Sequence, residues 1–237
     1  MLYKKAMLYK KTLFTLALVL LLGSSGLWAG DTAAFVDLGF SPDGKIYMFA
    51  QYGVHSQTLR PWADMFVVDV TRNDFVSGGR SSFVNERPVV PGQDGSGALY
   101  RLIAQNSSLA ARHNIDYCLQ GHPLFIAMDT ADPSRPIEFR DFEVGAQYRA
   151  SLVSQTEGSG SSLRSSFYIN LERTARDGTR TTYRVGTPQL RRPMISSYNI
   201  RKVMIAPNDG SMIFVIEMTR QDGASFDVRY MVEAVRL

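Results

Sequence analysis

Three residues with metal-binding side chains lie close together in the middle of the sequence. His113, Cys118 and His122 are separated by four and then three residues. Imidazole and thiolate are ligands that zinc prefers, but a structural zinc site needs four of them. Because a fourth ligand is missing, the pattern favours a buried Cys118 thiol beside surface histidines. We therefore predict no metal site here and no other cofactor.

The segment His55–Trp62 joins two strand-like segments and combines side chains that often bind ligands. It contains His55, Arg60 and Trp62, and Asp64 follows it. Loops on a rigid scaffold carry many binding sites, and Trp and Arg are frequent interface anchors. We therefore predict a binding site at His55, Arg60, Trp62 and Asp64. The alternative interpretation is that Trp62 packs beneath the loop and closes the edge of a sheet.

Acidic side chains flank two of the predicted strands, Asp37 with Asp43 and Asp64 with Asp69. Two carboxylates held close in a cleft can perform acid–base catalysis. Aspartate is also common in turns because its side chain binds nearby backbone groups, and that interpretation is favoured. The Gly-x-Ser-x-Gly motif of an α/β-hydrolase does not occur.

The elements that must position these residues are mainly β. A meander is predicted over residues 34–76, with strands at Phe35–Phe40, Lys45–Val54 and Ala63–Val70. Residues 123–237 are β-rich again. The strand candidates there are Leu124–Met128, Ile137–Phe142, Tyr148–Gln155, Ser166–Arg173, Thr179–Val185, Ile200–Ala206, Ser211–Thr219 and Ser225–Val235.

One amphipathic helix is predicted between these parts, over residues 94–114. Leu99, Leu102, Ile103 and Leu109 recur there at helical spacing, and Asn114 can end the helix. The expected fold is therefore α+β, with the helix packed on a sheet.

A short repeat links the two β-rich parts. Pro42-Asp43-Gly44 and Pro207-Asn208-Asp209-Gly210 both precede an apolar strand, and both turns resemble those of TolB-type β-propeller blades. A closed propeller needs about four blades or more, and only two are visible. The sequence thus predicts two blade-like antiparallel meanders within one domain, residues 31–237.

The first 30 residues have the three parts of a signal peptide. Four lysines precede the apolar run Leu13–Leu22, and small residues lead to a predicted cleavage after Ala29 or Gly30. Met7 is an alternative start, since Lys10 and Lys11 still follow it. The run is about half of the roughly 20 residues that span a membrane, so no transmembrane anchor is expected in the mature chain.

Removal of this segment changes the charge balance. The chain has 26 basic and 22 acidic side chains, and the loss of four lysines leaves 22 of each. A neutral mature chain does not favour nucleic acid as a partner. The predicted location is the periplasm or the exterior of a bacterium.

Several segments in order resemble a family of predicted secreted bacterial proteins, DUF2259. They are Gly39–Gly44, Gln51–Val54, Pro61–Asp64, Val67–Asp69, Ala98–Leu102, Gly186–Pro188, Arg191–Pro193, and Tyr198 ahead of Ala206–Gly210. The resemblance implies export and brings no catalytic residues.

These observations together favour a non-catalytic binding or assembly scaffold for a protein or cell-envelope ligand. The alternative is a periplasmic hydrolase or a metal-dependent enzyme, which would use His113, Cys118 and His122 or the acids near Asp64.

Overall fold

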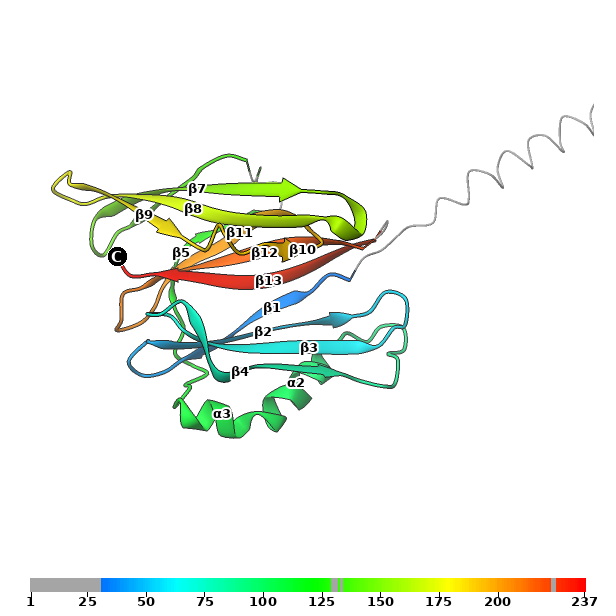
Figure 1. The fold of residues 1–237 in the computed structure, drawn as a ribbon. Coiled ribbons are helices and arrows are strands. Elements are labelled where there is room, and N and C mark those ends of the chain that lie inside the picture. The colour runs from blue at the N-terminus through cyan, green and yellow to red at the C-terminus, as the bar shows by residue number, and fades with distance from the viewer. Residues whose placement is uncertain (1–30, 129–131, 133, 223–224) are drawn as a thin grey trace, which may run out of the picture.

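A computed structural model describes residues 31–128, 132, 134–222 and 225–237. The predicted signal peptide, residues 1–30, lies outside the described residues. Figure 1 shows three β-sheets stacked on one another, with two helices beneath the lowest sheet. None of the helices in the described part of the chain is long and apolar enough to cross a membrane.

The lowest layer, here the N-terminal sheet, is an antiparallel meander in the order β1-β2-β3-β4. Its strands are β1 (Ala34–Phe40), β2 (Ile46–Val54), β3 (Pro61–Asp69) and β4 (Asp74–Val84). The sequence predicted the first three strands and missed β4. Strand β4 is a half-exposed edge strand with a register irregularity opposite Phe66–Val68. Apolar and polar residues therefore do not alternate regularly along it, and its sequence lacks the pattern that predicts a strand.

The middle sheet has the order β13-β12-β11-β5. Its strands are β5 (His122–Ile126), β11 (Ile195–Ile205), β12 (Met212–Asp222) and β13 (Ser225–Val235). The outer sheet has the order β10-β8-β7-β6, with β9 also paired to β8. Its elements are β6 (Ile137–Asp141), β7 (Ala146–Glu157), a 3-10 turn η1 (Gly160–Ser162), β8 (Arg164–Thr174), β9 (Arg180–Val185) and β10 (Arg192–Pro193).

Strand β12 shows why the middle sheet is buried on both faces. Phe214 and Ile216 belong to the core shared with the outer sheet, whereas Ile213 and Val215 belong to the core shared with the N-terminal sheet. Successive side chains of a strand point to opposite faces. A continuous apolar run is therefore what a doubly covered strand requires.

Two helices cover the other face of the N-terminal sheet, α2 (Ser96–Gln105) and α3 (Ser107–Arg112). The prediction of one helix over residues 94–114 is wrong at Asn106. The side-chain nitrogen of Asn106 donates to the Leu102 carbonyl (2.8 Å), and its side-chain oxygen accepts a hydrogen bond from the Ser81 hydroxyl (2.8 Å). Such side-chain bonds compete with the helical backbone, so the helix is interrupted there. Asn114, with a φ of 50°, ends the second helix as expected.

The two Pro-Asp-Gly turns meet each other in the structure. The Asn208 side-chain amide donates to the Pro42 carbonyl (2.9 Å), and a Cβ on Gly44 would lie 1.6 Å from the Pro207 carbonyl oxygen. The similar hairpins therefore face each other in two stacked sheets. This stacking does not confirm a propeller-like arrangement of the repeats, although the mainly β, antiparallel fold is as predicted.

The edge strand β13 is covered by groups from the N-terminal part of the chain. The Val228 amide donates to the Asp31 carbonyl (2.8 Å), the Tyr230 amide to Gln51 (2.7 Å) and the Ala234 amide to Asn73 (2.7 Å). An uncovered edge strand offers these amides to other chains. Their use here fastens the middle sheet to the N-terminal sheet.

Candidate functional site

A pocket of about 510 Å³ lies where the N-terminal sheet meets the middle sheet. Its lining comes from the start of the described chain, the β2–β3 loop and the tip of the β12–β13 hairpin. Asp31, His55, Arg60, Arg220 and Arg229 are among the residues that line it. Two of the predicted binding residues, His55 and Arg60, are thus brought together by the fold.

Asp31 is the most fully bonded residue of the pocket. Its carboxylate lies 2.6 Å from His55 Nδ1 and accepts a hydrogen bond from the Ser56 amide (2.5 Å). Its own backbone amide donates to the Asp227 carboxylate (3.0 Å). Asp31 therefore connects the β2–β3 loop, through its carboxylate, to the β12–β13 hairpin, through its backbone amide.

These bonds determine the acidity of Asp31. Burial alone would raise the pKa of this carboxyl, but the hydrogen bonds from Ser56 and His55 outweigh burial, so the pKa lies below its ordinary value. Asp31 is consequently ionised throughout the neutral range. Its negative charge orients the imidazole of His55 and faces the guanidinium of Arg229.

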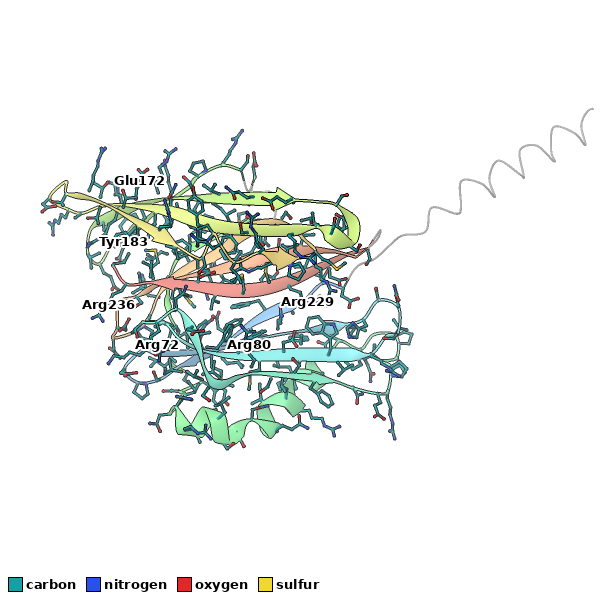
Figure 2. The ribbon with its side chains drawn as sticks, viewed as in Figure 1. Arg72, Arg80, Glu172, Tyr183, Arg229 and Arg236 are labelled. Carbon is teal, nitrogen blue, oxygen red and sulfur yellow. The ribbon has the colours of Figure 1, made fainter. Side chains whose placement is uncertain are left out.

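Arg229 is held in place from several sides, and Figure 2 marks it between the middle sheet and the N-terminal sheet. Its Nη2 lies 3.6 Å from the Asp31 carboxylate and 4.0 Å from that of Asp227. Its Nη1 donates to the backbone carbonyls of Asp31 (3.0 Å) and Val228 (2.9 Å). Burial lowers the pKa of Arg229, while the nearby charges of Asp227, Asp31 and Asp64 oppose that shift. The guanidinium is a fixed part of the pocket wall.

Trp62 forms the support beneath this network. The side chain is 3% exposed, its ring lies 6.0 Å from the His55 ring, and the Arg229 guanidinium carbon lies 4.0 Å from the ring centre. Trp62 Nε1 is buried and has no hydrogen-bond partner among the described residues. Trp62 packs beneath the loop and orients His55 and Arg229 rather than facing solvent.

Asp64 lies behind the pocket rather than in its lining. Its carboxylate accepts a hydrogen bond from Gln51 (3.2 Å), and its charge acts on Arg229. Arg60 and Arg220, in contrast, are exposed and line the pocket. Neither side chain makes an ion pair or hydrogen bond with another residue that the structure describes. They are the cations of the pocket that are available to an anionic ligand.

The other sequence candidates do not form a site. Within the described residues, no group of three His, Cys, Asp or Glu side chains could hold a metal ion, so His113, Cys118 and His122 do not come together. The expectation of a buried Cys118 is wrong, because this thiol is exposed. Asp37 is paired with Lys202 (2.6 Å) and bonded to the Tyr47 hydroxyl, which indicates a structural role.

The pocket combines a charge-paired wall with two arginines, Arg60 and Arg220, whose side chains have no ion-pair partner among the described residues. The hydroxyl groups of Ser56, Thr58 and Ser225 also line it, but no described hydroxyl is hydrogen-bonded to His55. The arrangement can bind an anionic group between Arg60 and Arg220. Asp31, Arg220, Asp227 and Arg229 were missed from the sequence because their only signal is their proximity in the fold.

The family comparison agrees with the resemblance noted from the sequence. A family model described as a predicted secreted protein, DUF2259, matches residues 48–236. No curated protein matches the chain. The matched segment begins within β2 and includes His55, Arg60, Trp62, Arg220 and Arg229, so most of the pocket lies inside it. The chain therefore belongs to the DUF2259 family of predicted secreted proteins.

Proposed function

We propose that this protein is a non-catalytic binding or assembly scaffold that works in the periplasm or outside the cell. It binds a partner or cell-envelope ligand through an anionic group that enters the pocket between Arg60 and Arg220. The observation that carries this proposal is the pair of unpartnered arginines beside a wall whose own charges are already paired.

The electrostatics of the pocket support an anionic ligand. Three arginines and two aspartates line it, and both aspartates face Arg229. The charged residues of the lining therefore carry a formal net charge of +1, and the side chains of Arg60 and Arg220 are not ion-paired with any described carboxylate. A guanidinium binds carboxylate and phosphate groups through two parallel hydrogen bonds, so both ligand classes fit this chemistry.

Inorganic phosphate is a direct probe of the pocket. Phosphate binding is expected to raise the melting temperature of the protein, because a ligand that binds only the folded state stabilises it. The variant with Arg60→Gln and Arg220→Gln should lose this shift. Arg112→Gln changes an exposed arginine that does not line the pocket, and it should keep the shift. An unchanged response in the double variant would contradict the proposal.

A hydrolase is the second candidate, and the Asp31–His55 pair favours it. An imidazole oriented by a carboxylate supplies two of the three members of a nucleophilic triad, and three residues with hydroxyl groups line the same pocket. Hydrolysis of p-nitrophenyl acetate that disappears in His55→Ala would favour the enzyme. Equal background rates for both proteins would favour binding.

Export by the predicted signal peptide is the remaining part of the proposal. We expect the exported protein to begin at Gly30 or Asp31, which corresponds to cleavage after Ala29 or Gly30. N-terminal sequencing of the protein recovered after export tests this. A chain that retains the run Leu13–Leu22 would show an anchor instead.

A further inference from the structure

Three exposed aliphatic side chains lie on segments at or beside the pocket, and one of them, Val84, lines it. Leu59, Val84 and Val90 are 51%, 48% and 59% exposed. The backbone connects them, since the Val89 amide donates to the Leu59 carbonyl (2.8 Å) and Val84 is paired with Trp62 in the ladder between β3 and β4. We call these three residues, which come from adjacent segments, the apolar strip.

Leu59 is held outward by an uncommon backbone conformation. Its φ is 54°, in the left-handed region that a side chain with a Cβ disfavours. The Leu59 amide donates to the His55 carbonyl (2.8 Å), so the tight loop enforces this conformation. A strained residue that presents an apolar side chain to solvent points to a contact made by that side chain.

Arginines flank the strip on both sides. Arg60 and Arg220 share the pocket with Val84, and Arg87 and Arg101 line a neighbouring pocket of about 690 Å³ that includes Pro61 and Phe83. With Arg229 there are five arginines at the two pockets, and four acids accompany them, Asp31 and Asp227 in the first pocket and Glu86 and Asp94 at the second, which leaves a formal net charge of +1. Glu86 lies beside Arg87, and the Asp94 carboxylate is bonded to the amide and hydroxyl of Ser96. We call Arg60, Arg87, Arg101, Arg220 and the apolar strip the rim surface.

The rim surface lies at the end of the molecule where the described chain begins. Asp31 lines the pocket, and Figure 1 places the start of β1, the β2–β3 loop and the start of β13 at one end. Eight residues separate Asp31 from the apolar run that ends at Leu22. An extended chain covers about 3.3–3.6 Å per residue, so this linker reaches at most roughly 30 Å. Before the predicted cleavage, Asp31 therefore stays within that distance of a membrane that holds the run Leu13–Leu22.

We infer that the rim surface docks on an anionic phospholipid bilayer. The arginines contact headgroup phosphates, and Leu59, Val84 and Val90 enter the boundary between headgroups and acyl chains, as in other interfacial proteins. This inference rests on the proposed function in one respect: the anionic group in the pocket is then a lipid phosphate.

Vesicle sedimentation of the exported protein tests the inference. Binding to mixed phosphatidylglycerol–phosphatidylcholine vesicles should exceed binding to pure phosphatidylcholine about fivefold, since each uncompensated arginine near an anionic surface contributes about a factor of five and the nearby acids offset all but one of the arginines. Salt should weaken this binding. Changing Arg60, Arg87 and Arg220 together to Gln should abolish the preference. The same change at Arg112, Arg176 and Arg180, which are exposed elsewhere, should preserve it.

A matched pair of variants tests whether an apolar side chain of the rim surface contributes to vesicle binding. Leu59→Asp should reduce vesicle binding, whereas Phe142→Asp should not. Phe142 is more exposed (83%) but lines neither pocket. Equal losses of vesicle binding in the two variants would show nonspecific hydrophobic adsorption and overturn the inference.

The outcomes separate the inference from the proposed function. Phosphate stabilisation without any preference for anionic vesicles would overturn membrane docking and leave the pocket proposal intact. Vesicle binding without phosphate stabilisation would support the rim surface and contradict the pocket proposal. Self-association that Leu59→Asp abolishes, without vesicle binding, would assign the strip to a second copy of the chain and overturn membrane docking.

Discussion

The guanidinium carbon of Arg229 lies 4.0 Å from the ring centre of Trp62. These two side chains come from different sheets, since Trp62 is in β3 of the N-terminal sheet and Arg229 is in β13 of the middle sheet. A buried cation over an indole face is favourable by about 2 kcal/mol. The pair therefore couples the pocket wall to the packing between the two sheets.

Trp62→Ala is expected to destabilise the protein. Removing a buried Trp side chain costs about 3–5 kcal/mol, because it leaves a cavity beneath His55 and Arg229. Trp62→Phe should cost less, since it keeps a ring and removes the unpartnered buried Nε1. Urea unfolding measures both changes. If Trp62→Ala keeps its stability but loses phosphate binding, Trp62 contacts the ligand and does not support the pocket.

Asp31→Asn is expected to change how stability depends on pH. The pKa of Asp31 is lowered in the folded state, so its contribution is complete above the unfolded pKa and is lost as the pH falls through the folded pKa. The stability difference between wild type and Asp31→Asn should therefore be constant near pH 7 and shrink below about pH 4. Urea unfolding at several pH values measures this difference. A difference that stays constant into strong acid would contradict an ionised, bonded Asp31.

Gly44→Ala and Gly78→Ala form a matched pair. Their φ values are 72° and 71°, so both substitutions carry the same backbone strain of about 1–2 kcal/mol. A Cβ on Gly78 meets nothing within 4 Å, whereas a Cβ on Gly44 would overlap the Pro207 carbonyl oxygen. Gly44→Ala should therefore be much more destabilising in thermal unfolding. Equal losses would mean that the two Pro-Asp-Gly turns are not in contact.

Asn73→Gly is expected to weaken the junction between sheets by about 2 kcal/mol or more. The side-chain nitrogen of Asn73 donates to the Glu233 carboxylate (2.6 Å), and its side-chain oxygen accepts a hydrogen bond from the backbone amide of Ala234 (2.7 Å). Glycine preserves the left-handed φ of 51° but removes both bonds. Asn114→Gly is the control, because Asn114 has a φ of 50° and is exposed after α3. Chemical unfolding should show a loss only for Asn73→Gly.

The strands were largely predictable because their signals are local. Turns such as Ser41–Gly44 and Ala175–Gly178 combine residues that favour tight reversals, and the apolar strands next to them match the structure. Strand β4 and the break at Asn106 were not predictable in this way. Both depend on tertiary contacts, namely pairing with β3 and the bond from Ser81.

The pocket was predictable only in the part that a single loop supplies. His55 and Arg60 are near each other in sequence, but Asp31, Arg220 and Arg229 reach them only when β13 lies along the N-terminal segment. The environment of Arg192 could likewise not be predicted from its sequence neighbours. Its pairing with Glu233 (3.3 Å) leaves it 14% exposed, although adjacent arginines are usually solvated.

The covering of β13 by Asp31, Gln51 and Asn73 has a consequence for the order of assembly. Strand β13 is the last strand, and its Val232 and Ala234 complete the core that contains Tyr47 and Phe49. The contacts join residues separated by about 160 to 200 positions. A chain that emerges from its N-terminus must therefore wait for its final segment before that core closes. Until then Tyr47 and Phe49 lack the covering that Val232 and Ala234 give them.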